Sequence, residues 1–255
     1  MPQMRLDKLL ADMGVASRKE LREIIRAGRV QVDGLTETRP ERKLDPDTAA
    51  VLFDGKALRY QPYHYYMIDK PVGVVTATED KKQQTVLDLL PPELRRLGLF
   101  PVGRLDKDTS GLLLLTDDGD FAHRVISPKS CVKKRYYAEV EGEVDEEDAA
   151  AFSRGIVLRD GTQCLPAELE LLGGGRCLVT VMQGKYDQVR RMLASRGKPV
   201  LALRRLSVGG LQLGEELGAG GFRELDEGDL CTLFNARNMG KSSKNSFIIQ
   251  AFLSG

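Results

Sequence analysis

The fold is decided by the stretch Phe100-Pro-Val-Gly-Arg-Leu-Asp-Lys-Asp-Thr-Ser-Gly-Leu-Leu-Leu-Leu-Thr-Asp-Asp-Gly119. Residues 112–115 are a continuous apolar run that ends at Asp118-Gly119, which predicts a strand buried on both faces and closed by a turn. The preceding residues 103–111 are mostly polar and have glycine at both ends. A buried strand gives a loop a rigid base, and sites are commonly built in this way. We therefore expect a functional carboxylate in this loop.

Composition limits the class of protein. The chain has 255 residues, of which 42% are hydrophobic and 29% charged, so it is globular and long enough for a small domain plus a medium one. The net charge of +1 gives no global signal for nucleic acid. No apolar run approaches the roughly 20 residues of a membrane span, and the N-terminus has no apolar signal core. We expect a cytoplasmic protein without a membrane partner.

Cysteine and histidine usage narrows the chemistry. None of the four cysteines forms a C-x-x-C pair, which favours free thiols in a reducing compartment. Two histidines, His64 and His123, exclude a His-rich metal site and argue against a Ser-His-Asp triad. His123 has no orienting partner in its surrounding pattern, so we interpret it as structural.

Residues 1–59 are predicted to form a small module. Leu6, Leu9 and Leu10 have helical spacing, and Gly14 ends that helix. A capping box, Ser17-Arg-Lys-Glu20, opens a second helix, and the strand 30–32 follows with a tight turn.

The second helix carries a basic ridge. Like charges four residues apart cost a few tenths of a kcal/mol per pair, so the ridge suggests a phosphate partner, whereas a solvated surface is the plain alternative. The module resembles S4-type RNA-binding domains through Arg5-Leu-Asp-Lys-Leu-Leu, Ser17-Arg and Ile25-Arg-Ala-Gly-Arg-Val-Gln-Val-Asp-Gly34. In that family the helices and hairpin bind structured RNA. The resemblance implies RNA contacts from Arg5, Lys8, Arg18, Lys19, Arg22 and Arg29.

Residues 60–234 are predicted to form a larger domain. Short strands alternate with short helices and few strict βαβ repeats, which indicates the α+β class: a small ααβ domain joined to a mainly antiparallel sheet. Residues 235–255 begin with a polar stretch without periodicity, and we predict a disordered tail.

Two further segments carry candidate catalytic residues. In the strand that begins near Lys134, Tyr136, Ala138 and Val140 share the inward face, while Tyr137 and Glu139 share the other. A core tyrosine is the plain alternative for Tyr136.

The other segment is Gly184-Lys-Tyr-Asp187, which leads into a helix over 188–196 that Asp187 is expected to cap. Arg190 and Arg191 fall in its first turn, where cations oppose the helix dipole. We therefore expect an anionic partner for them, either a carboxylate or a phosphate. A surface acid paired with Arg190 is the plain alternative. One carboxylate, one phenol and one guanidinium suit nucleophilic or base chemistry by a carboxylate that an arginine keeps ionised.

Taken together, these motifs resemble bacterial ribosomal RNA pseudouridine synthases of the RsuA type. The motifs are Gly103 to Gly119, Lys134-Arg-Tyr136, Gly184-Lys-Tyr-Asp-Gln-Val-Arg-Arg-Met192 and Leu203-Arg-Arg-Leu-Ser-Val-Gly-Gly-Leu211. The resemblance implies that Asp106 is the essential aspartate, that Tyr136 contacts the base, that Arg190 pairs with Asp106, and that Leu203 packs near the base. Expected RNA contacts are Arg104, Thr109, Lys134, Lys185, Gln188, Arg191 and Leu203.

The implied reaction isomerises a flipped uridine without a cofactor. Asp106 either attacks C1′ or removes a proton from C2′, and the resemblance leaves both roles open. Asp187 departs from the family, in which His often precedes this glutamine, and we expect little consequence for the chemistry.

The substrate class is ribosomal RNA, free or in an immature subunit, with the protein as a monomer. The Asp106-Lys-Asp-Thr-Ser and Thr116-Asp-Asp-Gly forms favour the small-subunit RNA, with the large-subunit RNA as the alternative. A non-catalytic S4-type assembly factor is the rival from another class. An aspartate-based phosphatase fits poorly, because the strand lies after Asp106 rather than before it.

Overall fold

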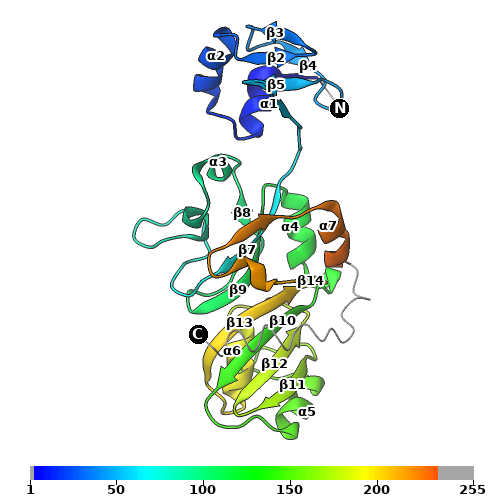
Figure 1. The fold of residues 1–255 in the computed structure, drawn as a ribbon. Helices are drawn as coiled ribbons and strands as arrows, with labels where there is room; N and C mark the ends of the chain where they lie inside the picture. Colours follow the sequence, from blue (N-terminus) through cyan, green and yellow to red (C-terminus); the bar gives the residue numbers. More distant parts are fainter. Residues whose placement is uncertain (1–2, 235–255) are drawn as a thin grey trace. The chain divides into compact units, whose positions relative to one another are not determined.

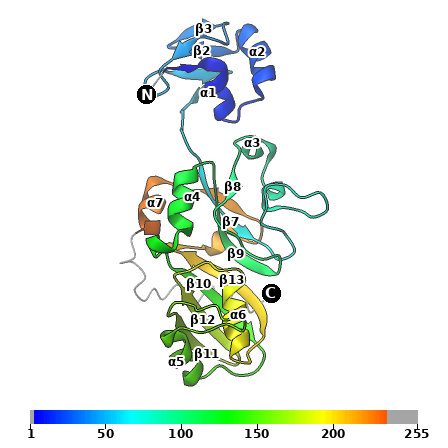
Figure 2. The same ribbon diagram turned by 180° about the vertical axis from the view of Figure 1, so that it is seen from behind.

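The computed structural model describes residues 3–234, which fall into two compact units (Figures 1 and 2). The first unit runs through His64 and also includes Leu90–Leu99, and the second comprises Tyr65–Leu89 and the chain from Phe100 onward. We predicted a boundary after residue 59. The predicted tail, residues 235–255, lies outside the described residues. No helix within residues 3–234 is long and apolar enough to cross a membrane.

The first unit packs its two N-terminal helices against short antiparallel strands. Its core is made by Leu6, Leu9 and Leu10 together with Leu21 and Ile25, as the helical spacing predicted. The predicted capping box is present, because the Ser17 hydroxyl accepts from the Glu20 amide and the Glu20 carboxylate accepts from the Ser17 amide. The elements are β1 (Met4–Arg5), α1 (Leu6–Asp12), α2 (Arg18–Arg26), β2 (Val30–Val32), β3 (Leu35–Glu37), β4 (Lys43–Leu44), β5 (Val51–Phe53), β6 (Lys56–Leu58) and α3 (Pro92–Arg95).

The second unit is built on a sheet that has nine strands among the described residues. Its main path is β11-β12-β10-β13-β9-β7-β15, in which only the β13–β9 pair is parallel. The strands are β7 (Tyr65–Lys70), β8 (Phe100–Pro101), β9 (Thr109–Thr116), β10 (Lys134–Val140), β11 (Glu168–Gly173), β12 (Arg176–Val181), β13 (Val200–Val208), β14 (Leu211–Gln212) and β15 (Phe222–Glu224). The α+β class with a mainly antiparallel sheet is thus confirmed.

Up to residue 234, four α-helices accompany this sheet: α4 (Gly119–Ile126), α5 (Glu146–Arg154), α6 (Gln188–Ser195) and α7 (Glu227–Phe234). Single 3-10 turns are η1 (Val86–Leu89), η2 (Pro128–Ser130) and η3 (Glu215–Leu217). The helices α5 and α6 pack with β10 and β12, whereas α4 and α7 pack with β9, so the unit has two adjoining cores (Figure 1).

Strand β9 lies inside the sheet, and all eight of its residues are buried. It begins at Thr109, so the buried strand reaches further into the polar stretch than the apolar run alone indicated. Gly111 has φ +107°, and a Cβ there would lie 2.2 Å from the Arg205 carbonyl oxygen. Glycine is therefore required where β9 and β13 pair in parallel.

Tyr136 and Tyr137 lie on opposite faces of the sheet, as the alternation predicted, and the second face is buried at Tyr137. Tyr137 packs there against Leu178 and Leu206. Glu139, on the same face, accepts a hydrogen bond from the Tyr137 hydroxyl at 2.7 Å. A charged residue on the same face thus indicates that the tyrosine hydroxyl has a hydrogen-bond partner, and not that the ring is exposed.

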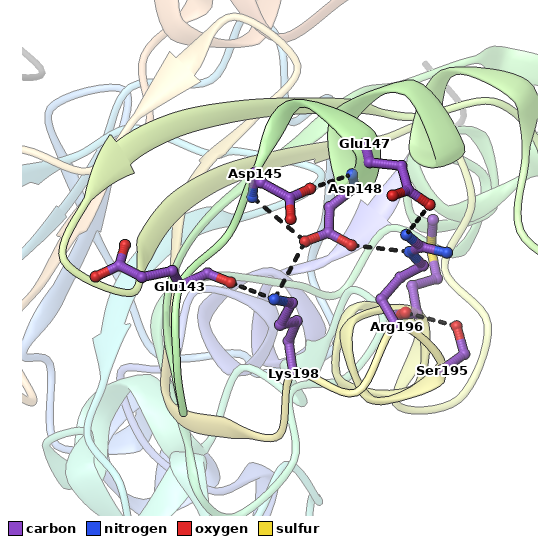
Figure 3. A network of polar contacts seen from close by, with 8 residues as sticks. Glu143, Asp145, Glu147, Asp148, Ser195, Arg196 and Lys198 are labelled. Atoms are coloured by element: carbon purple, nitrogen blue, oxygen red, sulfur yellow. Dashed lines mark hydrogen bonds and ion pairs between the residues drawn. The ribbon is translucent and has the colours of Figure 1, made fainter.

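A polar network fixes the end of α6 to α5 (Figure 3). The buried Asp148 carboxylate lies 2.8 Å from Arg196 Nε and 3.7 Å from Lys198 Nζ. Asp145 and Asp148 form a reciprocal capping box at the start of α5, as Figure 3 shows. The network anchors one end of the helix whose other end carries the predicted Lys185–Arg191 motif.

Candidate active site

A cavity of about 650 Å³ lies in the second unit, where its two cores adjoin. Its wall comes from the loop before β9, the end of α4, strands β10 and β13, and the turn before α6. The predicted site residues that line it are Arg104, Asp106, Thr109, Lys134, Tyr136, Lys185, Gln188 and Leu203. Segments distant in sequence thus converge on one cavity, although neither Arg190 nor Arg191 is among the described residues of its wall.

Asp106 is presented by a loop that is tied on both sides. The Thr109 amide donates to the Asp106 carbonyl oxygen at 3.0 Å, which closes a turn directly after the aspartate. Before it, the buried Thr76 hydroxyl donates to the Leu105 carbonyl oxygen at 2.6 Å and accepts from the Leu105 amide at 3.2 Å. These bonds fix the backbone on either side of the carboxylate.

A buried lysine holds the same loop from beneath. Lys70 Nζ donates to the Thr109 carbonyl oxygen at 2.8 Å and to the Pro71 carbonyl oxygen at 3.0 Å. Burial lowers the pKa of Lys70 to about 8, while the nearby Asp108 and Asp106 carboxylates act in the opposite direction. Lys70 therefore contributes both a clamp and a nearby positive charge to the Asp106 loop.

The predicted pair between Arg190 and Asp106 is not formed within residues 3–234. The Arg190 guanidinium instead lies 3.1 Å from the Asp108 carboxylate, and it donates to the carbonyl oxygens of Asp108 and Val200 at 3.2 Å each. The tight turn after Asp106 separates the two carboxylates, so Asp106 lines the cavity whereas the Asp108 side chain is 68% exposed. Arg190 thus restrains the loop two residues beyond the aspartate.

The two arginines in the first turn of α6 pair with carboxylates of the protein. Arg190 pairs with Asp108, and Arg191 Nη2 lies 2.5 Å from Asp160 Oδ2. The cap predicted for Asp187 is absent, because its side chain accepts no hydrogen bond from the first turn of α6 and its backbone has φ +48°. Burial, followed by repulsion from Asp106, raises the pKa of Asp187 to about 6.

Tyr136 is half-buried on β10 and faces the cavity. A buried arginine that the sequence analysis overlooked accompanies it. Arg205 Nη1 donates to the Tyr136 hydroxyl at 3.4 Å, and its Nε donates to the Leu112 carbonyl oxygen at 2.7 Å. Arg205 therefore joins β13 to β9 and places a fixed positive charge at the phenol.

The other cavity cations are engaged to different degrees. Lys134 is buried and donates to the Val132 carbonyl oxygen at 3.0 Å, and burial lowers its pKa to about 8. Lys185 Nζ donates to the Gln163 carbonyl oxygen at 2.6 Å, and Gln188 accepts from the Lys185 amide at 3.1 Å. Arg104 is exposed at the cavity, and no described residue pairs with its guanidinium.

Three cavity residues carry features that the sequence reasoning undervalued. Tyr186 lines the cavity and is 77% exposed, which is unusual for a large aromatic side chain. His123, interpreted as structural, is exposed and also lines it. The Thr109 hydroxyl is buried without a hydrogen-bond partner among the described residues, which suits contact with a ligand.

One buried aspartate, Asp7, pairs with three arginines of the predicted S4 surface. Asp7 has no exposed side-chain area and lies 2.8 Å from Arg5, 3.4 Å from Arg18 and 4.0 Å from Arg22. Hydrogen bonds from Arg5 are the largest cause of its lowered pKa. Lys8 pairs with Asp12 at 3.7 Å and Arg29 with Asp54 at 2.5 Å. The three guanidinium groups around Asp7 remain about half exposed, so they present one basic surface.

Lys70 and Arg205 could have been found from their positions in the sequence. Lys70 closes an apolar strand, and Arg205 sits within the mostly buried strand β13. A charged side chain is rarely buried without a specific partner, so each of these positions pointed to a structured polar site.

Comparison with known proteins agrees with this geometry. A family model described as RNA pseudouridylate synthase matches residues 64–195, and an S4 domain model matches residues 4–48. The chain is 43% identical to the uncharacterised RNA pseudouridine synthase YtzG of Bacillus subtilis, covering 89% of this chain and 97% of that protein.

Two further relatives and one solved structure extend the match. Ribosomal small subunit pseudouridine synthase A is 39% identical in Vibrio cholerae, covering 91% of this chain, and 37% identical in Escherichia coli, covering 90%; both relatives are covered in full. A crystal structure of a pseudouridylate synthase has 32% identity and a TM-score of 0.64, and covers 90% of this chain and 99% of that one. The chain therefore belongs to the RNA pseudouridylate synthase family, as an enzyme that carries an S4 domain before its catalytic unit.

Proposed function

We propose that this enzyme converts one uridine of small-subunit ribosomal RNA to pseudouridine, with Asp106 as the group that acts on the ribose. The observation that carries the proposal is that Asp106 and Tyr136, far apart in sequence, line one cavity with the cations Arg104, Lys185 and Arg205. The names of the relatives in Vibrio cholerae and Escherichia coli support the small-subunit RNA as substrate.

The cavity suits a base that has left its stack. Its volume of about 650 Å³ is in the range of small-molecule sites, and extruding a nucleotide costs a few kcal/mol. Tyr136 offers a ring beside the base, and Leu203 offers an apolar contact from β13. Arg104, as an exposed cation at the cavity, suits an RNA phosphate. The exposed Tyr186 ring suits stacking on a flanking base.

The reaction needs only a rearrangement of bonds. The Asp106 carboxylate attacks C1′ or takes the C2′ proton, and in either case the N1–C1′ bond breaks and uracil leaves with its electron pair. The uracil then turns within the cavity and C5 bonds to C1′. In the first route this step displaces the Asp106 carboxylate from C1′, and in the second Asp106 returns the proton to C2′. The C5 proton is finally lost while N1 gains one. Arg190 serves as a positioning residue, because it holds Asp108 and thereby the turn that presents Asp106.

The first unit is proposed to bind a structured part of the same RNA. Its support is the cluster of Arg5, Arg18 and Arg22 around Asp7, with Lys8, Lys19 and Arg29 as further cations. We propose a monomer that acts in the cytoplasm on ribosomal RNA or on an immature small subunit.

The test is a pseudouridine map by carbodiimide treatment and primer extension. Wild-type protein is incubated with unmodified small- and large-subunit RNA, each free and within immature particles. We expect one new stop, in the small-subunit RNA. A stop confined to the large-subunit RNA would overturn the proposed substrate while keeping the chemistry.

A further inference from the structure

Asp187 is a second carboxyl group in the catalytic cavity. It lies on the turn before α6 and lines the cavity together with Asp106. Its backbone is in the left-handed region at φ +48°, where aspartate is tolerated better than most residues but still at some cost. It also occupies the N-cap position of α6 without capping it. Its carboxyl group is therefore not used for the local task that aspartate usually performs there.

The polar atoms of Asp187 are poorly satisfied by the protein itself. Its Oδ1 is buried and has no hydrogen-bond partner within residues 3–234, and the same is true of Arg190 Nε, 3.7 Å away. The charged groups that act on it are Asp106 and Asp108 from the loop before β9, and Arg190 and Arg191 from α6. Asp187 thus lines the cavity with a carboxyl group that makes no hydrogen bond to the described residues, and a ligand in the cavity is the partner that remains for it.

The surroundings of Asp187 make it easier to protonate than an ordinary aspartate. Burial and the nearby Asp106 raise the pKa of Asp187, and Arg190 offsets this only in part. Asp106 must carry its charge to act on the ribose. Two carboxyl groups that line one cavity favour a shared proton once a bound base excludes water, and such a pair divides into different roles.

The reaction needs a hydrogen-bond donor at the position of the Asp187 carboxyl group. When the glycosidic bond breaks, the leaving uracil carries negative charge that is shared with its carbonyl oxygens. A preorganised donor aimed at such an oxygen stabilises the transition state. The C2 carbonyl, N3–H and C4 carbonyl are symmetric about the axis through N3 and C6, about which the base must turn. One group on this edge can therefore hold the base both before and after the turn.

We propose that protonated Asp187 donates a hydrogen bond to a carbonyl oxygen of the flipped uracil and is a further catalytic residue of this enzyme. The inference rests on the proposed function. Asp187 keeps its proton throughout, so no atom is transferred to or from it. From the sequence alone we expected little chemical consequence of Asp187 in place of histidine; the cavity gives the replacement a role.

The test compares three variants on the substrate RNA identified by the pseudouridine map. Asp187→Ala removes the donor, Asp187→Asn keeps an N–H donor that cannot ionise, and Asp120→Asn is a control at an exposed position of α4. We expect Asp187→Ala to lower kcat by about 100-fold with little change in KM, because the lost bond acts in the transition state. Asp187→Asn should stay within about tenfold of wild type.

The pH profile separates this role from a structural one. Wild-type kcat should fall on the alkaline side as Asp187 loses its proton. The midpoint of this fall should lie above the pKa of about 6 that Asp187 has in the protein alone, because the bound base excludes water and raises the pKa further. Asp187→Asn should lack this fall, and Asp120→Asn should keep it.

Two results would overturn the inference: an Asp187→Ala enzyme as fast as the Asp120→Asn control, or the same alkaline fall in wild type and Asp187→Asn. If Asp187→Ala does not fold, the profile of Asp187→Asn decides alone. Failure of wild-type protein to modify any RNA would overturn the proposed function, and this inference with it.

Discussion

Arg190 holds Asp108 twice, because its guanidinium lies 3.1 Å from the Asp108 carboxylate and 3.2 Å from the Asp108 carbonyl oxygen. It also donates to the Val200 carbonyl oxygen at the start of β13. Arg190 therefore ties α6, β13 and the loop of Asp106 together. Its contribution to catalysis is geometric, since it fixes the turn next to the reacting carboxylate.

This arrangement predicts unequal effects for the two partners. Asp108→Asn removes an exposed charge but leaves the backbone contact, so kcat should fall by less than about tenfold. Arg190→Gln removes all three contacts and should lower kcat by roughly 100-fold through misplacement of Asp106. A double-mutant cycle in kcat should show that Asp108→Asn adds little once Arg190 is replaced. Fully additive effects would contradict the coupling.

Arg104 is predicted to contact phosphate. Arg104→Gln should weaken RNA binding for any sequence and lower the salt slope of log K by about one ion. The measurement is filter binding across a series of salt concentrations. The control is Arg154→Gln at the exposed end of α5, outside the cavity wall, which should leave the slope unchanged. Equal slopes for wild type and Arg104→Gln would remove Arg104 from the interface.

Lys70 predicts how stability depends on alkaline pH. Its pKa in the folded protein, about 8, lies below the ordinary lysine value, so above pH 8 the unfolded chain binds a proton that the folded chain has lost. Stability due to this group therefore rises with pH, by at most about 1.4 kcal/mol per pH unit. Lys70→Met should reduce this slope between pH 8 and 10 in urea unfolding. The exposed control Lys81→Met should not, and an unchanged slope in Lys70→Met would contradict the assignment.

Asp7 predicts an acid dependence of the opposite sign. Its pKa in the folded protein is lowered, so its contribution is complete above the ordinary aspartate value and is lost as pH falls through the lowered one. At pH 7, Asp7→Asn should destabilise α1 and α2 by roughly 1–3 kcal/mol, because three guanidinium groups lose their shared acceptor.

Hydrogen exchange of peptides from α1 and α2 measures this effect. The difference between Asp7→Asn and wild type should shrink below pH 4. Asp12→Asn, which breaks only the exposed pair with Lys8, should change protection by about 0.5 kcal/mol or less. A difference for Asp7→Asn that persists at low pH would show that the acid acts through packing instead.

Local patterns predicted much of the fold. The helical spacing of Leu6, Leu9 and Leu10 and the capping box at Ser17 are each set by nearby residues, and each is present. Asp106, Tyr136 and Leu203, which the resemblance singles out, line one cavity, and their roles there stay predictions.

The features of the site that could not be predicted from the sequence depend on contacts between distant segments of the chain. Arg190 pairs with Asp108 and not with Asp106 because of the turn that follows Asp106. The spacing of these residues in the sequence does not predict that turn. The sequence does not reveal that Lys70 binds the Thr109 carbonyl oxygen or that Arg205 binds the Leu112 carbonyl oxygen, because these acceptors come from other segments of the chain. Asp187 fits the cap pattern by residue type, but its left-handed backbone prevents the cap.

The most direct test of the central claim is tritium release from RNA labelled at C5 of uridine, because formation of pseudouridine expels that hydrogen. Wild-type protein should release one tritium per RNA. Asp106→Asn should release none while it still binds the RNA with wild-type affinity. Release by Asp106→Asn at a rate near that of wild type would contradict the assignment of Asp106 as the group that acts on the ribose.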